Sequence, residues 1–100
     1  MLTVTLLPQA KNDIKDAAIW YNNHQKGVGK RFTNQVRNKI KYCQKHPKTI
    51  AIRYDETRTV LVPDFPYMIH FIVEELNKNI VIVAVLHTSR SPKLWKKRLM

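Results

Sequence analysis

The stretch Ile80-Val81-Ile82-Val83-Ala84-Val85-Leu86 decides the fold, because it holds seven consecutive apolar residues with no polar alternation. A strand that is half exposed alternates apolar and polar side chains, whereas a continuous apolar run is typical of a strand buried on both faces. A buried helix is the competing interpretation, but the β-branched residues at 80–83 and 85 favour a strand. The sequence therefore predicts a central strand that is covered on both sides.

Shorter strand-like segments precede this run. Each is rich in β-branched or aromatic residues and is bounded by turn residues, which is the pattern of strands in an antiparallel sheet. We expect strands over 50–54, 59–62 and 65–73, separated by a turn at 55–57, a break at 63–64 and a final turn over 74–79.

The first half of the chain predicts one strand and two helices. Residues 2–7 alternate weakly as a strand that ends at Pro8, and a helical period runs from Ala10 to about His24. We expect Trp20 and Tyr21 to close the core of a hairpin with the second helix. That second helix has an apolar stripe and ends before a proline; the stripe and the proline are Val28, Phe32, Val36, Ile40, Cys43 and Pro47.

These elements together predict an α+β fold of two layers in the order β-α-α-β-β-β with a basic carboxyl-terminal tail. The connection between the helices is short, so they form an antiparallel hairpin. This hairpin packs on a mostly antiparallel sheet of four or five strands. A chain of 100 residues has room for one domain, which we place over 1–100.

The charge of the chain is concentrated in two blocks. Lys and Arg total 18 against 7 Asp and Glu, which gives a formal net charge of +11. Residues 26–48 and 90–100 carry basic residues and no acid. Two solvated faces are the plain interpretation, but two acid-free blocks on a small domain favour an anionic partner such as a nucleic acid or an acidic protein.

Several classes of protein are excluded or disfavoured. The single cysteine, Cys43, excludes an internal disulfide framework, and we expect it to be a small buried residue in a reducing cytoplasm. No His/Cys set has metal-ligand spacing and no glycine loop cradles a phosphate, so no cofactor is expected. No apolar run reaches the length of a membrane span, and the first residues do not form a signal peptide.

An ordered set of residues runs through both halves of the chain. In the second half the set comprises Arg58, residues 65–71, residues 83–92 and Trp95; in the first half it comprises Ala10, Asp13, Ile14, Trp20, Tyr21, Phe32 and Pro47. This set resembles the RelE/ParE toxin superfamily, and the spacing of His87, Arg90, Pro92 and Trp95 resembles its ParE-like branch most. The resemblance covers almost the whole chain.

The resemblance implies the toxin of a type II toxin–antitoxin pair with an acidic antitoxin as its partner. ParE-like toxins inhibit DNA gyrase without cleaving a substrate, whereas RelE-like toxins cut mRNA on the ribosome. The ParE-like activity is our first hypothesis. Ribosome-dependent cleavage of mRNA is the alternative, and an inert relative that only binds a protein partner is the second alternative.

Three residues are the catalytic candidates if the protein is a ribonuclease. Arg58 would stabilise charge on the phosphate, although an ion pair with a nearby carboxylate is the alternative. His87 would carry a proton, or else hydrogen-bond the tail. Arg90 would hold phosphate, or else pair with an acidic residue of the 74–79 turn. His70 lies within a strand, where a core histidine is the better interpretation.

The ribonuclease set is incomplete. RelE-like nucleases commonly place a tyrosine near the chain end, and this chain has none after Tyr67, while Thr88 follows His87. The resemblance therefore favours a protein that is not an enzyme and that binds its target through the basic tail. The residues that we expect to bind the target are Arg90, Lys93, Trp95, Lys96, Lys97 and Arg98. The alternative is that the charges are solvated while Trp95 covers the core, and for Trp95 this is the favoured interpretation.

Overall fold

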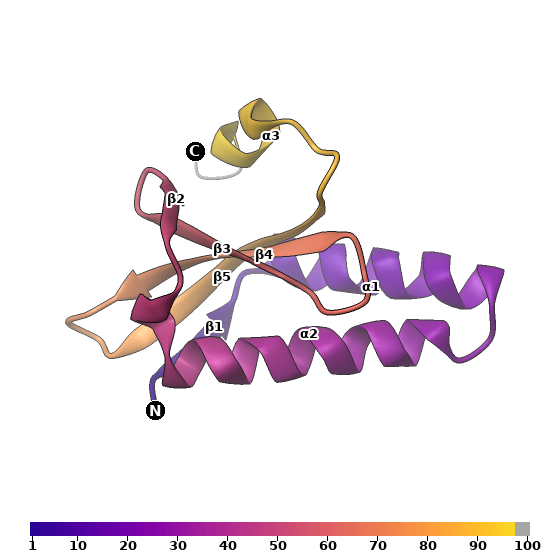
Figure 1. Cartoon of the computed structure of the whole chain (residues 1–100), viewed down its shortest axis with the longest axis horizontal. Helices are drawn as coiled ribbons and strands as arrows, with labels where there is room; N and C mark the ends of the chain where they lie inside the picture. Colours follow the sequence, from indigo (N-terminus) through magenta and orange to yellow (C-terminus); the bar gives the residue numbers. More distant parts are fainter. Residues whose placement is uncertain (98–100) are drawn as a thin grey trace.

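The fold is a two-helix hairpin against a five-stranded sheet, with a short helix at the carboxyl end (Figure 1). The computed structural model describes residues 1–97. The elements in chain order are β1 (Thr3–Leu6), α1 (Pro8–His24), α2 (Val28–Lys45), the 3-10 helix η1 (Pro47–Thr49), β2 (Ile52–Tyr54), β3 (Thr57–Leu61), β4 (Tyr67–Glu74), β5 (Asn79–His87) and α3 (Pro92–Lys97).

The sheet has the order β1-β5-β4-β3-β2. β1 runs parallel to β5, and the other neighbours are antiparallel. The hairpin of α1 and α2 lies along one side of the sheet, and α3 lies on the other side (Figure 1). The predicted α+β class, the helical hairpin and the mostly antiparallel sheet are confirmed. Four strands follow the hairpin, one more than the order β-α-α-β-β-β contains.

β5 is the central strand that its apolar run predicts. All residues from Val83 to Leu86 are buried, and Ile80 and Ile82 are fully buried. One hydrophobic cluster joins β4 and β5 to the hairpin through residues such as Phe32 and Phe71. A second cluster joins the opposite face of the sheet to Trp95 of α3. Cover on both faces explains why the run has no polar alternation.

The hairpin depends on close contact between its helices. A side chain at Gly29 would collide with the backbone carbonyl oxygen of Ala18, so a glycine is required where the helices approach. Gly27 precedes α2 with a φ of 90°, a left-handed conformation that glycine adopts without strain. Tyr21 packs on Phe32 as predicted, with ring centroids 5.5 Å apart.

Trp20 does not belong to the core of the hairpin, and that prediction was wrong. Its side chain is 54% exposed and stacks on His24, with ring centroids 3.9 Å apart. Trp20 and Tyr21 are neighbours on a helix, about 100° apart around its axis. Burying Tyr21 against α2 therefore turns Trp20 toward solvent.

Some element boundaries differ from those predicted. The tail forms the helix α3 because Trp95 has a buried site on the sheet. α1 begins at Pro8 rather than at Ala10, since proline at the first helical position has no N–H to leave unpaired. β3 begins at Thr57 rather than at residue 59, because Asp55 adopts a positive φ of 44° and allows a tighter turn.

Candidate functional site

A recess lies at the carboxyl end of β5, between α1 and the segment that leads to α3. We call it the β5-end recess, and its volume is about 590 Å³. It combines carboxylates, aromatic rings, an imidazole and a guanidinium, which come from distant parts of the chain. Its lining residues are Asp13, Asp16, Ala17, Trp20, Tyr21, Pro66, Tyr67, Val85, Leu86, His87, Arg90 and Leu94.

The register of β4 and β5 places His87 opposite Tyr67. Their rings meet edge to face, with centroids 5.3 Å apart. The Nδ1 atom of His87 lies 3.1 Å from the backbone nitrogen of Ser89 and 2.8 Å from its hydroxyl oxygen. A backbone N–H can only donate, so Nδ1 is the acceptor and the neutral ring carries its proton on Nε2.

The amino-terminal turns of α1 complete the edge of β5. β1 pairs with β5 only as far as Ile82. Beyond that point the Nε2 atom of Gln9 donates to the carbonyl oxygen of Val83 at 3.1 Å. A carboxylate oxygen of Asp13 accepts the backbone N–H of Val85 at 3.0 Å. Gln9 and Asp13 are four residues apart, so they lie on the same face of α1, which faces the edge of β5. Asp13 therefore forms part of the wall of the recess.

Burial raises the pKa of both phenols of the recess above its ordinary value. Burial raises the pKa of Tyr67 most, the charge of Arg90 lowers it, and the charge of Asp13 raises it. The pKa of Tyr21 is also raised, first by burial and then by Tyr67. Both hydroxyls are therefore available as hydrogen-bond donors at neutral pH.

The structure brings two of the three ribonuclease candidates together. His87 and Arg90 line the β5-end recess. Arg58 lies opposite Phe71 on β4, whereas His87 lies opposite Tyr67 on the same strand. Phe71 and Tyr67 are four residues apart, so the two positions are separated by about 13 Å along β4. Its guanidinium donates to the backbone carbonyl oxygen of Ile50 at 2.6 Å. Arg58 therefore holds the segment before β2, and the ion pair with a turn carboxylate is not observed among the described residues.

The predicted target-binding residues differ in exposure. Arg90, Lys93, Lys96 and Lys97 are exposed, whereas Trp95 is 5% exposed. Arg98 lies outside the described residues. The rings of Tyr54 and His70 lie 5.8 Å and 5.1 Å from Trp95, so Trp95 anchors α3 and holds its lysines over the sheet.

His70 is the core histidine that the sequence predicts. It is fully buried. Its Nδ1 atom lies 3.0 Å from the hydroxyl of Tyr54. Cys43 is also buried, as predicted.

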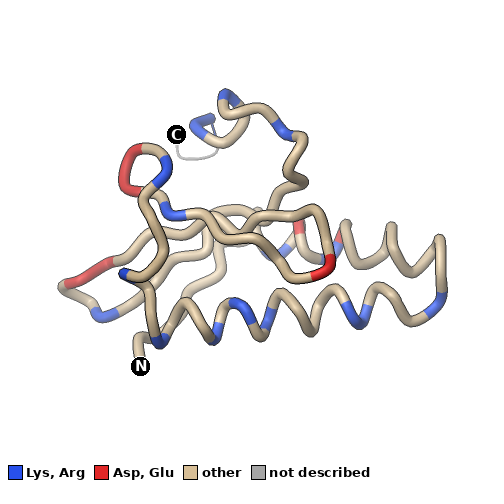
Figure 2. The backbone as a smooth tube through the Cα atoms, in the orientation of Figure 1, with Lys and Arg blue, Asp and Glu red and all other residues tan. Residues whose placement is uncertain are grey.

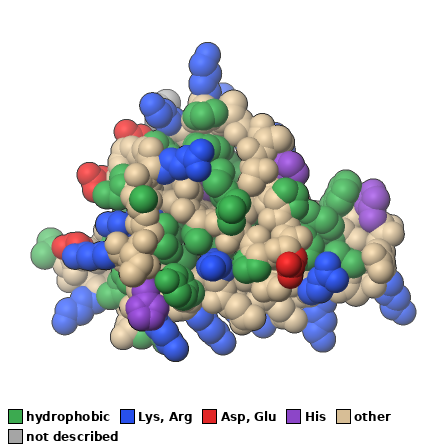
Figure 3. Space-filling view, in the orientation of Figure 1, with side chains coloured by type: hydrophobic (Ala, Val, Ile, Leu, Met, Phe, Trp, Pro, Cys, Tyr) green, Lys and Arg blue, Asp and Glu red, His purple; other side chains and the backbone are tan. Residues whose placement is uncertain are grey.

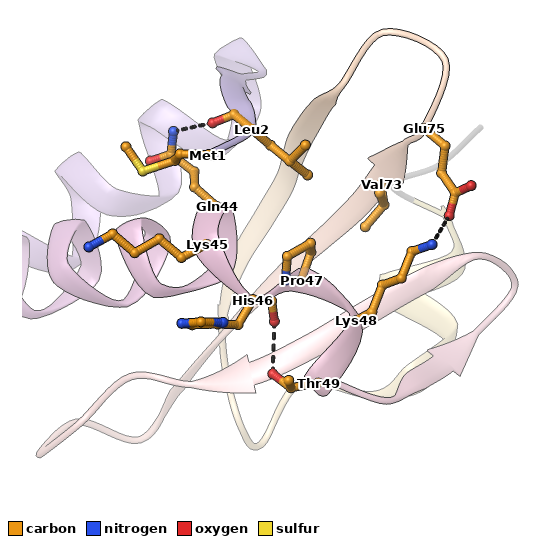
Figure 4. Close-up of a pocket in the computed structure, with 10 residues that line it drawn as sticks. All are labelled: Met1, Leu2, Gln44, Lys45, His46, Pro47, Lys48, Thr49, Val73 and Glu75. Carbon is orange, nitrogen blue, oxygen red and sulfur yellow. Dashed lines mark hydrogen bonds and ion pairs between the residues drawn. The ribbon is translucent and has the colours of Figure 1, made fainter.

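A second hollow lies between the start of β1, the carboxyl end of α2, and η1 (Figure 4). The amide of Gln44 donates to the carbonyl oxygen of Leu2 at 2.8 Å and ties α2 to the chain before β1. The ammonium of Lys48 lies 2.7 Å from Glu75, and its hydrogen bond and charge lower the pKa of that carboxyl. Both side chains are mostly exposed, and ion pairs in solvent contribute little stability.

A third hollow is an apolar groove between β1 and α2, which we call the β1–α2 groove. Its volume is about 270 Å³. Its floor is formed by Val4, Leu6, Ile14, Val36 and Ile40, and its remaining lining is Thr33, Arg37, Lys41 and Gln44. The sequence could not reveal this groove, because the apolar stripe of α2 does not indicate which of its side chains remain uncovered.

Residues 1–97 contain neither a cluster that could hold a metal ion nor a helix that could span a membrane. No group of three or more His, Cys, Asp or Glu side chains in this part of the chain could hold a metal ion. Among its helices, none has the length and hydropathy needed to cross a bilayer.

A helical hairpin on a five-stranded mixed sheet is the architecture of the RelE/ParE toxins. Residues 4–92 match the family model described as the ParE toxin of the type II toxin–antitoxin system parDE. Because the match spans most of the chain, the protein belongs to the ParE toxin family and is the toxin of a type II toxin–antitoxin system.

Two solved structures share the fold. A chain of the chromosomal ParDE toxin–antitoxin system from P. aeruginosa has a TM-score of 0.75 and 16% sequence identity, over 87% of this chain and 96% of that chain. The isolated E. coli RelE toxin has a TM-score of 0.65 and 13% identity, over 100% of both chains. A search of curated proteins gives no significant match.

Proposed function

We propose that this toxin inhibits DNA gyrase by binding it, and that an acidic antitoxin holds it inactive in the cytoplasm. The observation that carries the proposal is the β5-end recess, which is lined by His87 and Arg90 and lies where the chain leaves β5 for α3 with its exposed lysines. Arg90 and the lysines of α3 are exposed cations, which suits binding to an acidic protein surface, and the carboxylates Asp13 and Asp16 line the α1 side of the same recess.

The arrangement of the three candidates argues against a ribonuclease. A general base needs a free lone pair, and in the neutral form of His87 the Nδ1 lone pair is used by Ser89 while Nε2 carries the proton. Arg58, which would stabilise the phosphate, donates to the backbone carbonyl oxygen of Ile50 and lies opposite Phe71, about 13 Å along β4 from the residue that faces His87. Nuclease chemistry would require both groups at one phosphate.

The β1–α2 groove fits the antitoxin. Its floor is apolar and its edge carries Arg37 and Lys41, so a segment with apolar anchors and acidic neighbours matches it. Thr3 and Leu7 direct their N–H groups toward the β5 side of β1. Because strand residues alternate, Val4 and Leu6 direct theirs outward, where an extended segment can add as a strand. Charge complementarity would speed association.

The proposal is tested by inducing the toxin alone in bacteria and following incorporation of labelled thymidine, uridine and methionine in the first minutes. We expect DNA synthesis to fall first, and co-expression of the antitoxin to restore it. An early fall in protein synthesis would support mRNA cleavage instead. Unchanged growth with an intact fold would support an inert relative.

Charge-reversal variants test the binding surface. Arg90→Glu, or Lys96→Glu with Lys97→Glu, should weaken growth inhibition while the fold is retained, because all three side chains are exposed. Lys26→Glu is the matched control, since Lys26 is an exposed cation at the tip of the hairpin, outside the recess. Full toxicity of the Arg90 and lysine variants would overturn the site assignment.

The alternative function, mRNA cleavage, has its own test. It predicts that His87→Ala abolishes cleavage of mRNA on translating ribosomes, and that the wild-type toxin produces such cleavage. We expect no translation-dependent cleavage by the wild type. Cleavage that disappears in His87→Ala would replace gyrase inhibition with nuclease activity at the same recess.

A further inference from the structure

The solvent-facing side of α2 carries a row of cationic and amide side chains. We call this row the outer stripe of α2, and it consists of Lys30, Asn34, Arg37, Lys41 and Lys45, all of which are exposed. Their spacing of three or four residues places them on one face of the helix. The buried residues of α2 alternate with them and lie on the opposite face. At 1.5 Å per residue the stripe is about 22 Å long.

The charge of the outer stripe is not neutralised by the rest of the described chain. α2 contains no acidic residue. Within residues 1–97 the recorded ion pair joins Lys48 to Glu75, and none involves the stripe. Figure 2 shows the cations along α2 while the acidic residues gather at other positions, and Figure 3 shows basic side chains projecting from that edge of the molecule.

The geometry points to a specific partner: we propose that the outer stripe of α2 binds the sugar–phosphate backbone of duplex DNA. Lysine, arginine and asparagine are side chains that proteins use to contact phosphate oxygens. Successive cations such as Lys41 and Lys45 lie about 6 Å apart along the helix axis. A duplex presents one phosphate per about 3.4 Å on each strand, so a straight cationic helix meets several phosphates at once.

The composition of the stripe disfavours the other anionic partners. Protein interfaces gain most of their affinity from aromatic and apolar anchors. The stripe itself has none, and although Arg37 and Lys41 also border the apolar β1–α2 groove, Lys30 and Lys45 lie outside it. Single-stranded nucleic acid is held by aromatic platforms, and the stripe contains no aromatic residue. A membrane-surface helix inserts its apolar face, whereas the apolar face of α2 is buried in the main hydrophobic cluster. Backbone contacts of this kind carry no sequence readout.

The salt dependence of DNA binding tests the proposal. The full-length toxin is titrated into a labelled duplex of mixed sequence, and binding is followed by fluorescence anisotropy between about 50 and 200 mM KCl. With four cations contacting phosphates, log K should fall with log[salt] with a slope of about −3.6. Lys30→Gln with Lys45→Gln should reduce the magnitude of that slope by about 2.

Lys30 and Lys45 are chosen because neither lines the β1–α2 groove, so antitoxin binding should survive in this variant. The matched control is Lys11→Gln with Lys15→Gln on α1, which removes the same charge from exposed positions. The control should keep the wild-type slope, and circular dichroism checks that both double variants are folded.

Three results would overturn the inference: no binding of duplex DNA, equal loss of slope in the two double variants, or tighter binding of single-stranded DNA than of duplex. An acidic polypeptide is added as a competitor. If it binds the wild-type toxin in place of DNA but does not bind the Lys30→Gln, Lys45→Gln variant, the stripe would be assigned to a protein partner instead. The binding assay contains no gyrase, so a negative result would not contradict the proposed gyrase inhibition. Likewise, a failure to inhibit gyrase would not contradict DNA binding by the stripe.

Discussion

The Nδ1 atom of His87 accepts a hydrogen bond from the backbone N–H of Ser89 at 3.1 Å, so the single N–H proton of the neutral ring is on Nε2. The contact follows directly from the turn after β5, where the chain reverses toward α3. It makes His87 a donor in the β5-end recess rather than a proton acceptor. The same turn presents Arg90, which lines the recess together with His87.

The tautomer of His87 can be measured by NMR. Long-range ¹H–¹⁵N correlation spectra at a pH where the ring is neutral should show the proton on Nε2, because Nδ1 is held by the backbone of Ser89. Ser89→Ala removes the hydroxyl contact but keeps the backbone one, so the tautomer should persist. A neutral ring protonated on Nδ1 would contradict the geometry and restore the ribonuclease hypothesis.

Gly29→Ala should destabilise the hairpin. The new methyl group would meet the carbonyl oxygen of Ala18, which is backbone and cannot move aside without shifting α1. Overpacking of this kind costs about 1–3 kcal/mol, measured here by urea unfolding. Asn34→Ala, on the solvent-facing side of α2, is the control and should change stability by less than about 0.5 kcal/mol. A Gly29→Ala variant as stable as the wild type would mean that the helices are further apart.

Trp95→Ala should release α3 from the sheet. A helix of six residues is not stable alone, so its position depends on the buried indole beside Tyr54 and His70. We expect a loss of about 3–5 kcal/mol in urea unfolding, and a smaller loss in Trp95→Phe. If Trp95 acts only as an anchor, Trp95→Phe keeps its toxicity. Toxicity that disappears in a folded Trp95→Phe variant would show that the indole contacts the target.

Cys43 predicts a loss of stability at alkaline pH. Burial raises the pKa of its thiol from 9.0 to about 11. The unfolded chain therefore releases the proton first, and unfolding becomes more favourable as pH rises from about 9 to about 11. At about 1.4 kcal/mol per unit the loss approaches about 3 kcal/mol. Cys43→Ala, compared by urea unfolding over this pH range, should lose less; an unchanged pH dependence would refute the assignment.

The sequence was sufficient to predict the fold class because the residues that form its clearest hydrophobic patterns are also the most deeply buried. The apolar run from Ile80 to Leu86 favoured a strand covered on both faces over a buried helix because it is rich in β-branched residues, and the stripe through Phe32 and Val36 indicated the buried side of a helix. The tail was harder, since one tryptophan in a basic segment does not reveal that the sheet offers it a buried site. Trp95 is among the predicted target-binding candidates, with cover of the core as the favoured interpretation of its side chain, and the structure buries it.

The site was predicted in part. His87 and Arg90 are close in sequence, and local spacing was enough to place them together. The sequence did not predict that Asp13 belongs to the site, because its contact with Val85 spans 72 residues and depends on where β1 stops pairing with β5. The separation of Arg58 from His87 follows from strand register, which the sequence alone does not fix.

The measurement that tests the central claim most directly is a supercoiling assay with purified DNA gyrase and relaxed plasmid. We expect the wild-type toxin to inhibit supercoiling, the antitoxin to relieve the inhibition, and Arg90→Glu to inhibit at least about tenfold less, since the loss of about 1.4 kcal/mol of binding free energy is a factor of ten. Lys26→Glu should inhibit like the wild type. Normal supercoiling at every toxin concentration, with a folded and growth-inhibiting protein, would contradict the account.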